Sequence, residues 1–191
     1  MIRKAVYSDL EAVARIYEEL HEAEEKGCIT IGWTWDIYPV KATAEAALKR
    51  DDLFVLEDEG QLLGAGIINQ RQVDSYYGAP WEYKAADQEV FVLHTLVISP
   101  RAARKGLGRK FTSFFEEYAA QHGVHELRLD TNEKNLAARS MYKKLGYKEI
   151  AIVPTVFNGI PNVNLVLLEK QVNPALFRES SSKFLDRPSF R

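Results

Sequence analysis

Residues 99–110 read SPRAARKGLGRK, and the interpretation of the whole chain depends on them. They hold five basic side chains and no acid, although the chain of 191 residues has a formal net charge of −2. An apolar stretch at 90–98 precedes them, and a helical apolar pattern follows. Free N–H groups at a helix start, the helix dipole and the bare backbone of Gly106 and Gly108 together favour an anion. The segment therefore predicts a phosphate-binding loop between a strand and a helix.

Two well-known phosphate motifs do not fit this segment. A P-loop needs the pattern Gly-x-x-x-x-Gly-Lys-Ser/Thr, which these residues lack. A dinucleotide fingerprint needs a third glycine where Phe111 stands, and it follows the first strand of its fold rather than one in mid-chain. A different kind of phosphate ligand is therefore expected.

The composition is that of an ordinary globular protein, with 46% hydrophobic and 27% charged residues. The near-neutral net charge argues against a nucleic-acid partner, because nucleic-acid-binding proteins usually carry an excess of basic residues. Cys28 is the single cysteine, so neither an internal disulfide nor a cysteine-rich zinc site is expected. The N-terminus turns polar too early for a signal peptide, and no apolar run approaches the roughly 20 residues that span a bilayer. We expect a cytoplasmic protein with no membrane partner.

Apolar periodicity divides the chain into alternating strands and helices. Strands are expected at 1–6, 53–57, 62–69, 90–98, 126–130, 147–153 and 163–169, and helices at 8–27, 43–50, 107–123 and 135–146. Ser8 and Glu11 form a capping-box pattern, and Asn135 is placed to cap the last helix. This alternation predicts one mixed α/β domain over 1–170. The polar tail, 171–191, is expected to be loosely ordered or docked on a neighbour.

Two segments resemble the signature motifs of the GNAT superfamily of N-acetyltransferases. LHTLVISPRAARKGLGRKF (93–111) is similar to the family's central strand, Gln/Arg-x-x-Gly-x-Gly/Ala loop and helix. NLAARSMYKKLGYKE (135–149) is similar to its Asn-x-x-Ala-x-x-x-Tyr-x-x-x-Gly-Phe/Tyr motif. The resemblance covers roughly residues 1–170. It implies a mixed, mostly antiparallel central sheet of about seven strands flanked by about four helices, with acetyl-CoA as the co-substrate.

The resemblance assigns acetyl-CoA binding to the loop and to the strand before it. The strand's backbone would hold the pantetheine arm and the thioester, and the loop's amides and basic side chains would hold the pyrophosphate. The implied residues are Leu96, Val97, Ile98, Arg104, Lys105, Gly106, Leu107, Gly108, Arg109 and Asn135. One position departs from the family pattern, because Ala103 stands where the family has Gln or Arg. A backbone contact at that position survives the change.

Two side chains are candidates for proton transfer. Tyr142 matches the family's tyrosine and is the candidate general acid, since a phenol with a pKa of about 10 can protonate a thiolate. His94 is the candidate general base, because an imidazole with a pKa of about 6.5 suits proton removal at neutral pH, and LHTLV also resembles arylalkylamine N-acetyltransferases. The alternatives are a core tyrosine, a buried hydrogen-bonded histidine, and Glu82 or Glu89 as the base.

The acceptor side is expected to be aromatic. Trp33, Trp35 and Tyr38 lie in the region that lines the acceptor site in the family, and aromatic walls suit a small ligand. Ordinary core packing and a homodimer contact are the alternatives for these rings. A second aromatic cluster, a weaker candidate for the pocket, falls in the long connection at 70–88. Cys28 is read as an incidental thiol.

These observations lead to one functional hypothesis with two rivals. The hypothesis is an acetyl-CoA-dependent N-acetyltransferase whose acceptor is the primary amine of a small molecule, attacked directly in a ternary complex. The rivals are a protein lysine or N-terminal acetyltransferase and a non-catalytic acyl-CoA sensor. His21, His122 and His125 are scattered and read as surface residues, so no metal is expected.

Overall fold

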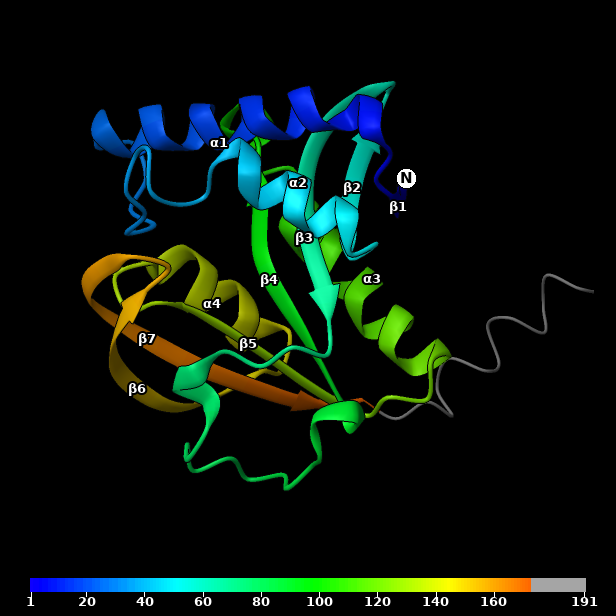
Figure 1. Ribbon diagram of the computed structural model, residues 1–191, viewed down its shortest axis with the longest axis vertical. Helices are drawn as coiled ribbons and strands as arrows, with labels where there is room; N and C mark the ends of the chain where they lie inside the picture. The colour runs from blue at the N-terminus through cyan, green and yellow to red at the C-terminus, as the bar shows by residue number, and fades with distance from the viewer. Residues whose placement is uncertain (173–191) are drawn as a thin grey trace, which may run out of the picture.

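The computed structural model describes residues 1–172, which form one seven-stranded sheet flanked by four α-helices (Figure 1). The strands lie in the order β1-β2-β3-β4-β5-β7-β6, and every neighbouring pair is antiparallel except β4 and β5. The strands are β1 Ile2–Lys4, β2 Leu53–Asp58, β3 Gln61–Asn69, β4 Val90–Ile98, β5 Glu126–Asn132, β6 Lys148–Phe157 and β7 Ile160–Gln171. The helices are α1 Leu10–Glu25, α2 Lys41–Lys49, α3 Leu107–Gln121 and α4 Leu136–Lys144. The predicted α/β fold class is confirmed.

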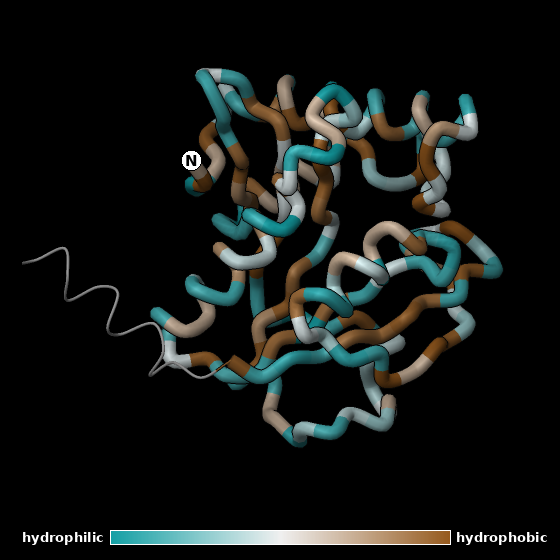
Figure 2. Tube along the Cα trace, turned by 180° about the vertical axis from the view of Figure 1, so that it is seen from behind, coloured by the Kyte–Doolittle hydropathy of each residue, from teal (hydrophilic) through white to brown (hydrophobic). Residues whose placement is uncertain are grey.

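The helices cover the two faces of the sheet, and apolar side chains fill the layers between them. One core joins α1 and α2 to the first strands around Val13, Ile16 and Val55. A second core joins α3 and α4 to the other face around Phe111 and Leu129. Figure 2 shows the apolar residues along the strands in the middle of the molecule and hydrophilic residues on the outer turns. None of the helices within 1–172 is long and apolar enough to cross a membrane.

Most predicted elements are present, with differences at their ends. The Ser8 capping box does not form: a short 3₁₀ turn, Tyr7–Asp9, precedes α1, and the Asp9 carboxylate accepts the Val6 N–H at 2.8 Å. The last two strands are longer than predicted because they continue into a hairpin that pairs Phe157 with Ile160. Residues 173–191, where most of the predicted tail falls, lie outside the described residues.

The sheet opens between its two central strands. β4 and β5 pair only from Val90 to Leu93, and beyond Leu93 they diverge. β4 also contains a bulge, because its register with β3 shifts between Ala65 and Ile67. The bulge lies just beyond Leu93, the last residue of β4 that pairs with β5. Thr95 sits in the bulge with a φ of 49°, an unusual conformation for a β-branched residue. Within residues 1–172, the remainder of β4 therefore has an unpaired backbone edge on its β5 side.

Candidate active site

A cavity of about 980 Å³ fills the opening between β4 and β5. Its walls come from the loop after α1, from β4 and β5, from the loop before α3 and from α4. Such openings at the centre of a sheet are common ligand sites, because two strands and several loops converge there. The predicted phosphate loop and the predicted catalytic tyrosine lie in the same cavity wall.

The predicted phosphate loop presents unpaired backbone amides. Within residues 1–172, the N–H groups from Arg104 to Arg109 have no hydrogen-bond partner, and the first helical bond of α3 is donated by Lys110 to the Gly106 carbonyl. Gly106, the residue immediately before α3, adopts a left-handed conformation with φ 75°, which glycine accepts without steric cost. Unpaired amides at a helix N-terminus form a site for an anion.

A buried polar contact holds this loop in place. The Ser99 hydroxyl, fully buried, donates to Glu19 Oε2 on α1 at 2.6 Å, and Arg101 Nη2 lies 2.9 Å from Glu19 Oε1. Gly108 is needed for packing as well as for approach to the backbone, since a Cβ there would lie 3.0 Å from Met141 Sδ. The loop is therefore fixed to α1 on one side and packed closely against α4 on the other.

Nearly all the predicted acetyl-CoA residues lie in the cavity wall. They are Leu96, Val97, Ile98, Arg104, Gly106, Leu107, Gly108, Arg109 and Asn135. Lys105 is the exception: it is exposed and outside the wall. Asn135 also caps α4, because its Oδ1 accepts the Ala138 N–H at 3.1 Å. The structure thus brings these residues together, while their part in binding stays a prediction.

Tyr142 lines the cavity from α4. The side chain is buried, and its hydroxyl has no hydrogen-bond partner among residues 1–172. Burial raises the pKa of the Tyr142 phenol above its usual value, and the nearby Asp130 carboxylate raises it further. The phenol therefore keeps its proton at neutral pH and is a weaker acid than an exposed tyrosine.

The structure does not bring His94 to the cavity. The imidazole is outside the wall, and its Nε2 lies 3.1 Å from Asn69 Oδ1. Burial lowers the pKa of His94 to about 4, so the ring is neutral at physiological pH. This geometry matches the alternative interpretation, a buried and hydrogen-bonded histidine, better than that of a general base. The other proposed bases are also outside the wall: Glu82 pairs with Lys148 Nζ at 2.5 Å, and Glu89 accepts the Ala86 N–H at 2.8 Å.

Two of the three predicted acceptor aromatics line the cavity. Trp33 and Tyr38 are in the wall. The Tyr38 ring packs edge to face on Trp33 and on Phe157, with ring centres 5.9 Å and 5.4 Å apart. The Tyr38 hydroxyl is hydrogen-bonded to Thr95 Oγ1 in the bulge. These contacts connect the loop after α1, β4 and the β6–β7 hairpin across one end of the cavity.

Trp35 lies outside this group, because it packs on His21 with ring centres 5.2 Å apart. His21 is buried, not a surface residue as predicted, and its Nε2 lies 3.0 Å from the Pro39 carbonyl oxygen. Cys28 is exposed and borders the cavity. Among the described residues, no three His, Cys, Asp or Glu side chains are grouped so that they could hold a metal ion.

Asp130, the acidic residue in the cavity wall, is not among the residues predicted for the site. Its Oδ2 accepts a hydrogen bond from the Tyr76 hydroxyl at 2.8 Å, and its Oδ1 has no partner within 1–172. Burial raises the pKa of Asp130 to about 6, although the Tyr76 hydrogen bond lowers it. The available signal was the alternation of Glu126, Arg128 and Asp130 with buried leucines along β5, which puts all three polar side chains on one face.

Comparisons with known proteins agree with this arrangement. The family model of the acetyltransferase (GNAT) family matches residues 11–147, and the chain belongs to this family. Over 150 residues it is 27% identical to the uncharacterized N-acetyltransferase YhfO of Bacillus subtilis, covering 78% of this chain and 89% of the relative. The fold matches a putative acetyltransferase of Staphylococcus aureus Mu50 with a TM-score of 0.67, 22% identity and coverage of 90% of this chain and 98% of the other.

A further structural match is yncA, a putative acetyltransferase of Salmonella typhimurium solved with its cofactor acetyl-CoA. The TM-score is 0.66 and the identity 20%, with 91% of this chain and 94% of the other covered. At these identities the two solved structures establish the fold, and the family match establishes the class of protein.

Proposed function

We propose that this protein transfers the acetyl group of acetyl-CoA to the primary amine of a small molecule. The observation that carries the proposal is one cavity that joins the unpaired amides of residues 104–109 to Asp130 and Tyr142. An anion site, an acid and a base in one cavity are the parts that an acetyl transfer from a phosphate-bearing donor requires.

The described residues fit acetyl-CoA. The amides from Arg104 to Arg109 would hold the pyrophosphate, and the cationic side chains of Arg104 and Arg109 border the same part of the cavity. The free backbone edge of β4 at Leu96–Ile98 offers hydrogen-bonding groups to an amide-containing arm. Acetyl-CoA supplies the activated acetyl group, as a thioester.

Asp130 and Tyr142 would move the protons. With a pKa of about 6, the Asp130 carboxylate is ionised at neutral pH and is a stronger base than an ordinary aspartate. It would attract a cationic acceptor and take one proton from its ammonium group, which leaves a neutral amine that can attack the acetyl carbon. The second proton, which the nitrogen loses as the amide forms, would replace the proton that Tyr142 gives to the sulfur. As the carbon–sulfur bond breaks, the Tyr142 hydroxyl would give its proton to the sulfur. The Asp130 carboxylate also raises the pKa of the Tyr142 hydroxyl, and both residues line the cavity.

The acceptor end supports a small substrate. The contacts of Tyr38 with Trp33, Thr95 and Phe157 gather bulky aromatic side chains in the cavity wall, whereas a peptide acceptor would need an open groove. Aromatic faces next to a single carboxylate favour a compact cationic amine, because rings and carboxylate both attract an ammonium group.

The test is a CoA-release assay over a panel of small primary amines, lysine-containing peptides and peptides with free N-termini. We expect turnover with at least one small amine and none with the peptides. Turnover of peptides alone would support a protein acetyltransferase instead. Tight acetyl-CoA binding by calorimetry with no turnover of any amine would support the sensor.

A further inference from the structure

The 70–89 connection between β3 and β4 lies along the sheet face formed by β5 and β7 (Figure 1). It contains only two 3₁₀ turns, at Asp74–Tyr76 and Asp87–Glu89, yet part of it is firmly packed. Tyr76 is 2% exposed, and it belongs to an apolar core with Val92 and Leu167. Connections with little regular structure usually run over the surface, so a deeply buried aromatic residue indicates that this one is an ordered part of the domain.

Arg128 fastens the connection to β5. This arginine is 4% exposed, and its two terminal nitrogens donate to Gln72 Oε1 at 2.5 Å and to the Tyr83 carbonyl at 3.0 Å. Its guanidinium carbon lies 4.2 Å from the centre of the Trp81 ring. A buried arginine with a stacked ring and two acceptors from one segment holds that segment in a defined position.

Two buried carboxylates complete the attachment. Glu169 Oε1 on β7 accepts the Glu82 N–H at 2.8 Å, and Glu126 Oε1 lies 3.8 Å from Arg128 Nε. Burial and the neighbouring Glu169 raise the pKa of Glu126 to about 8. The Arg128 guanidinium opposes this rise, because a neighbouring positive charge lowers the pKa of the Glu126 carboxyl.

A continuous set of contacts leads from this attachment to the cavity. Trp81 Nε1 donates to the Tyr76 carbonyl at 2.9 Å, and the two rings meet edge to face at 5.3 Å. The Tyr76 hydroxyl then reaches Asp130. Arg128 and Asp130 lie two residues apart on one face of β5, so one rigid strand carries both ends of this set of contacts.

We propose that Tyr76, held in place by Trp81 and Arg128, is a positioning residue for the Asp130 carboxylate. Its hydroxyl binds Oδ2, while Oδ1 has no hydrogen-bond partner among residues 1–172 and Asp130 itself lines the cavity. The 70–89 connection thereby takes part in acetyl transfer without touching the substrate. This inference rests on the proposed function, since it requires Asp130 to accept the proton.

Tyr76 also influences the charge of Asp130. The ionisable groups that face this carboxylate are Tyr38 from the loop before α2, Tyr76 from the connection, Tyr142 from α4 and Arg128 along β5. Among residues 1–172, the Tyr76 hydroxyl donates the one hydrogen bond that the Asp130 carboxylate accepts, and this bond lowers the pKa that burial raises. Removing it should raise the Asp130 pKa further.

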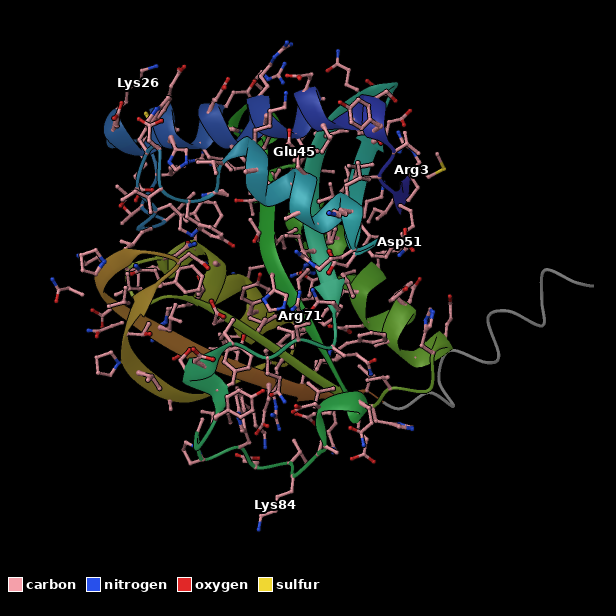
Figure 3. The ribbon with its side chains drawn as sticks, viewed as in Figure 1. Arg3, Lys26, Glu45, Asp51, Arg71 and Lys84 are labelled. Atoms are coloured by element: carbon pink, nitrogen blue, oxygen red, sulfur yellow. The ribbon has the colours of Figure 1, made fainter. Side chains whose placement is uncertain are left out.

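The test is Tyr76→Phe, which keeps the ring against Trp81 and removes only the hydroxyl. We expect the acid limb of kcat/KM to move to higher pH by on the order of one unit, with acetyl-CoA affinity unchanged. Trp81→Phe should also move the acid limb of kcat/KM to higher pH, but by a smaller amount. The control is Lys84→Ala, on the outer tip of the same connection, where Figure 3 shows the side chain pointing away from the sheet.

A second measurement does not depend on activity. Carboxyl ¹³C NMR of aspartate-labelled protein follows the titration of Asp130 directly in the wild type and in Tyr76→Phe, with Asp130→Asn to assign the signal. An unchanged Asp130 titration and a superimposable pH–rate profile would overturn the positioning role. If Asp130→Asn retains full turnover, the proposed function of Asp130 fails instead, so the two failures are distinguishable.

Discussion

The two ends of the cavity are built in different ways. The phosphate end is one contiguous loop, residues 99–110, whose amides and glycines act through the local backbone. The acceptor end is assembled from the loop after α1, the bulge in β4 and the end of β5, and the 70–89 connection supports Asp130 through Tyr76. A local site tolerates side-chain changes, because its main donors are backbone groups. An assembled site depends on individual side chains, so single substitutions there should have the larger effects.

The largest effect is expected at the assembled end, from Asp130→Asn. The amide cannot accept the proton but keeps the shape of the side chain and an oxygen for the Tyr76 hydroxyl. General base catalysis is typically worth about 10²- to 10⁴-fold, so kcat should fall by that range while acetyl-CoA affinity is retained. Steady-state kinetics beside calorimetric titration makes the measurement. Wild-type turnover in this variant would remove Asp130 from the mechanism.

Tyr142→Phe should have the next largest effect. The ring stays packed in the core, and only the hydroxyl that would protonate the sulfur is lost. A water molecule can replace part of its function, so we expect a loss in kcat near the lower end of the range, about 10²-fold. Equal losses in rate and in acetyl-CoA affinity would make Tyr142 a binding residue instead.

The same Asp130→Asn substitution should stabilise the fold at alkaline pH. The pKa of Asp130 is raised from 3.8 to about 6, so ionisation costs the folded state free energy that it does not cost the unfolded chain. This cost is absent below pH 3.8, develops as the pH rises to about 6, and is complete above it. The variant should therefore gain at most about 3 kcal/mol at pH 8 and nothing at pH 3.5. Chemical denaturation at the two pH values tests this, and an equal change at both would contradict it.

Side chains at the phosphate end should matter less. Replacing Arg104 and Arg109 together with alanine should weaken acetyl-CoA binding by about tenfold, because each exposed charge contributes on the order of 1 kcal/mol or less. The loss should shrink at high salt. Lys105→Ala is the matched control, since that side chain is outside the cavity wall, and it should leave the dissociation constant unchanged. A loss of a thousandfold in the double variant would show that side chains, not amides, carry the binding.

The smallest effect is expected from His94→Gln. The glutamine can keep a hydrogen bond to Asn69, and His94 is already neutral above about pH 4. The pH dependence of kcat/KM between pH 5 and 9 should therefore match that of the wild type. Loss of the acid limb of kcat/KM in this variant would instead support His94 as the general base.

The sequence by itself determined the order of strands and helices, the family, and the loop with unpaired amides for which phosphate binding is predicted. Each of these is encoded over a short contiguous stretch: the apolar periodicity of α3, the left-handed Gly106 before it, and the Asn135 cap of α4. Backbone geometry and hydrogen bonds between near neighbours follow from such stretches without knowledge of the rest of the fold.

Only the tertiary structure decided which polar side chains face the cavity. Leu93 packs on the α3 side of the sheet, whereas Val97, an even number of residues later, packs on the α1 side. The bulge at Thr95 causes this reversal, and a simple alternation pattern cannot reveal it. Asp130 meets Tyr76, 54 residues away, because the 70–89 connection packs on the sheet face from which the Asp130 side chain projects. Contacts of that range depend on how the chain folds back on itself, and no local pattern in the sequence specifies them.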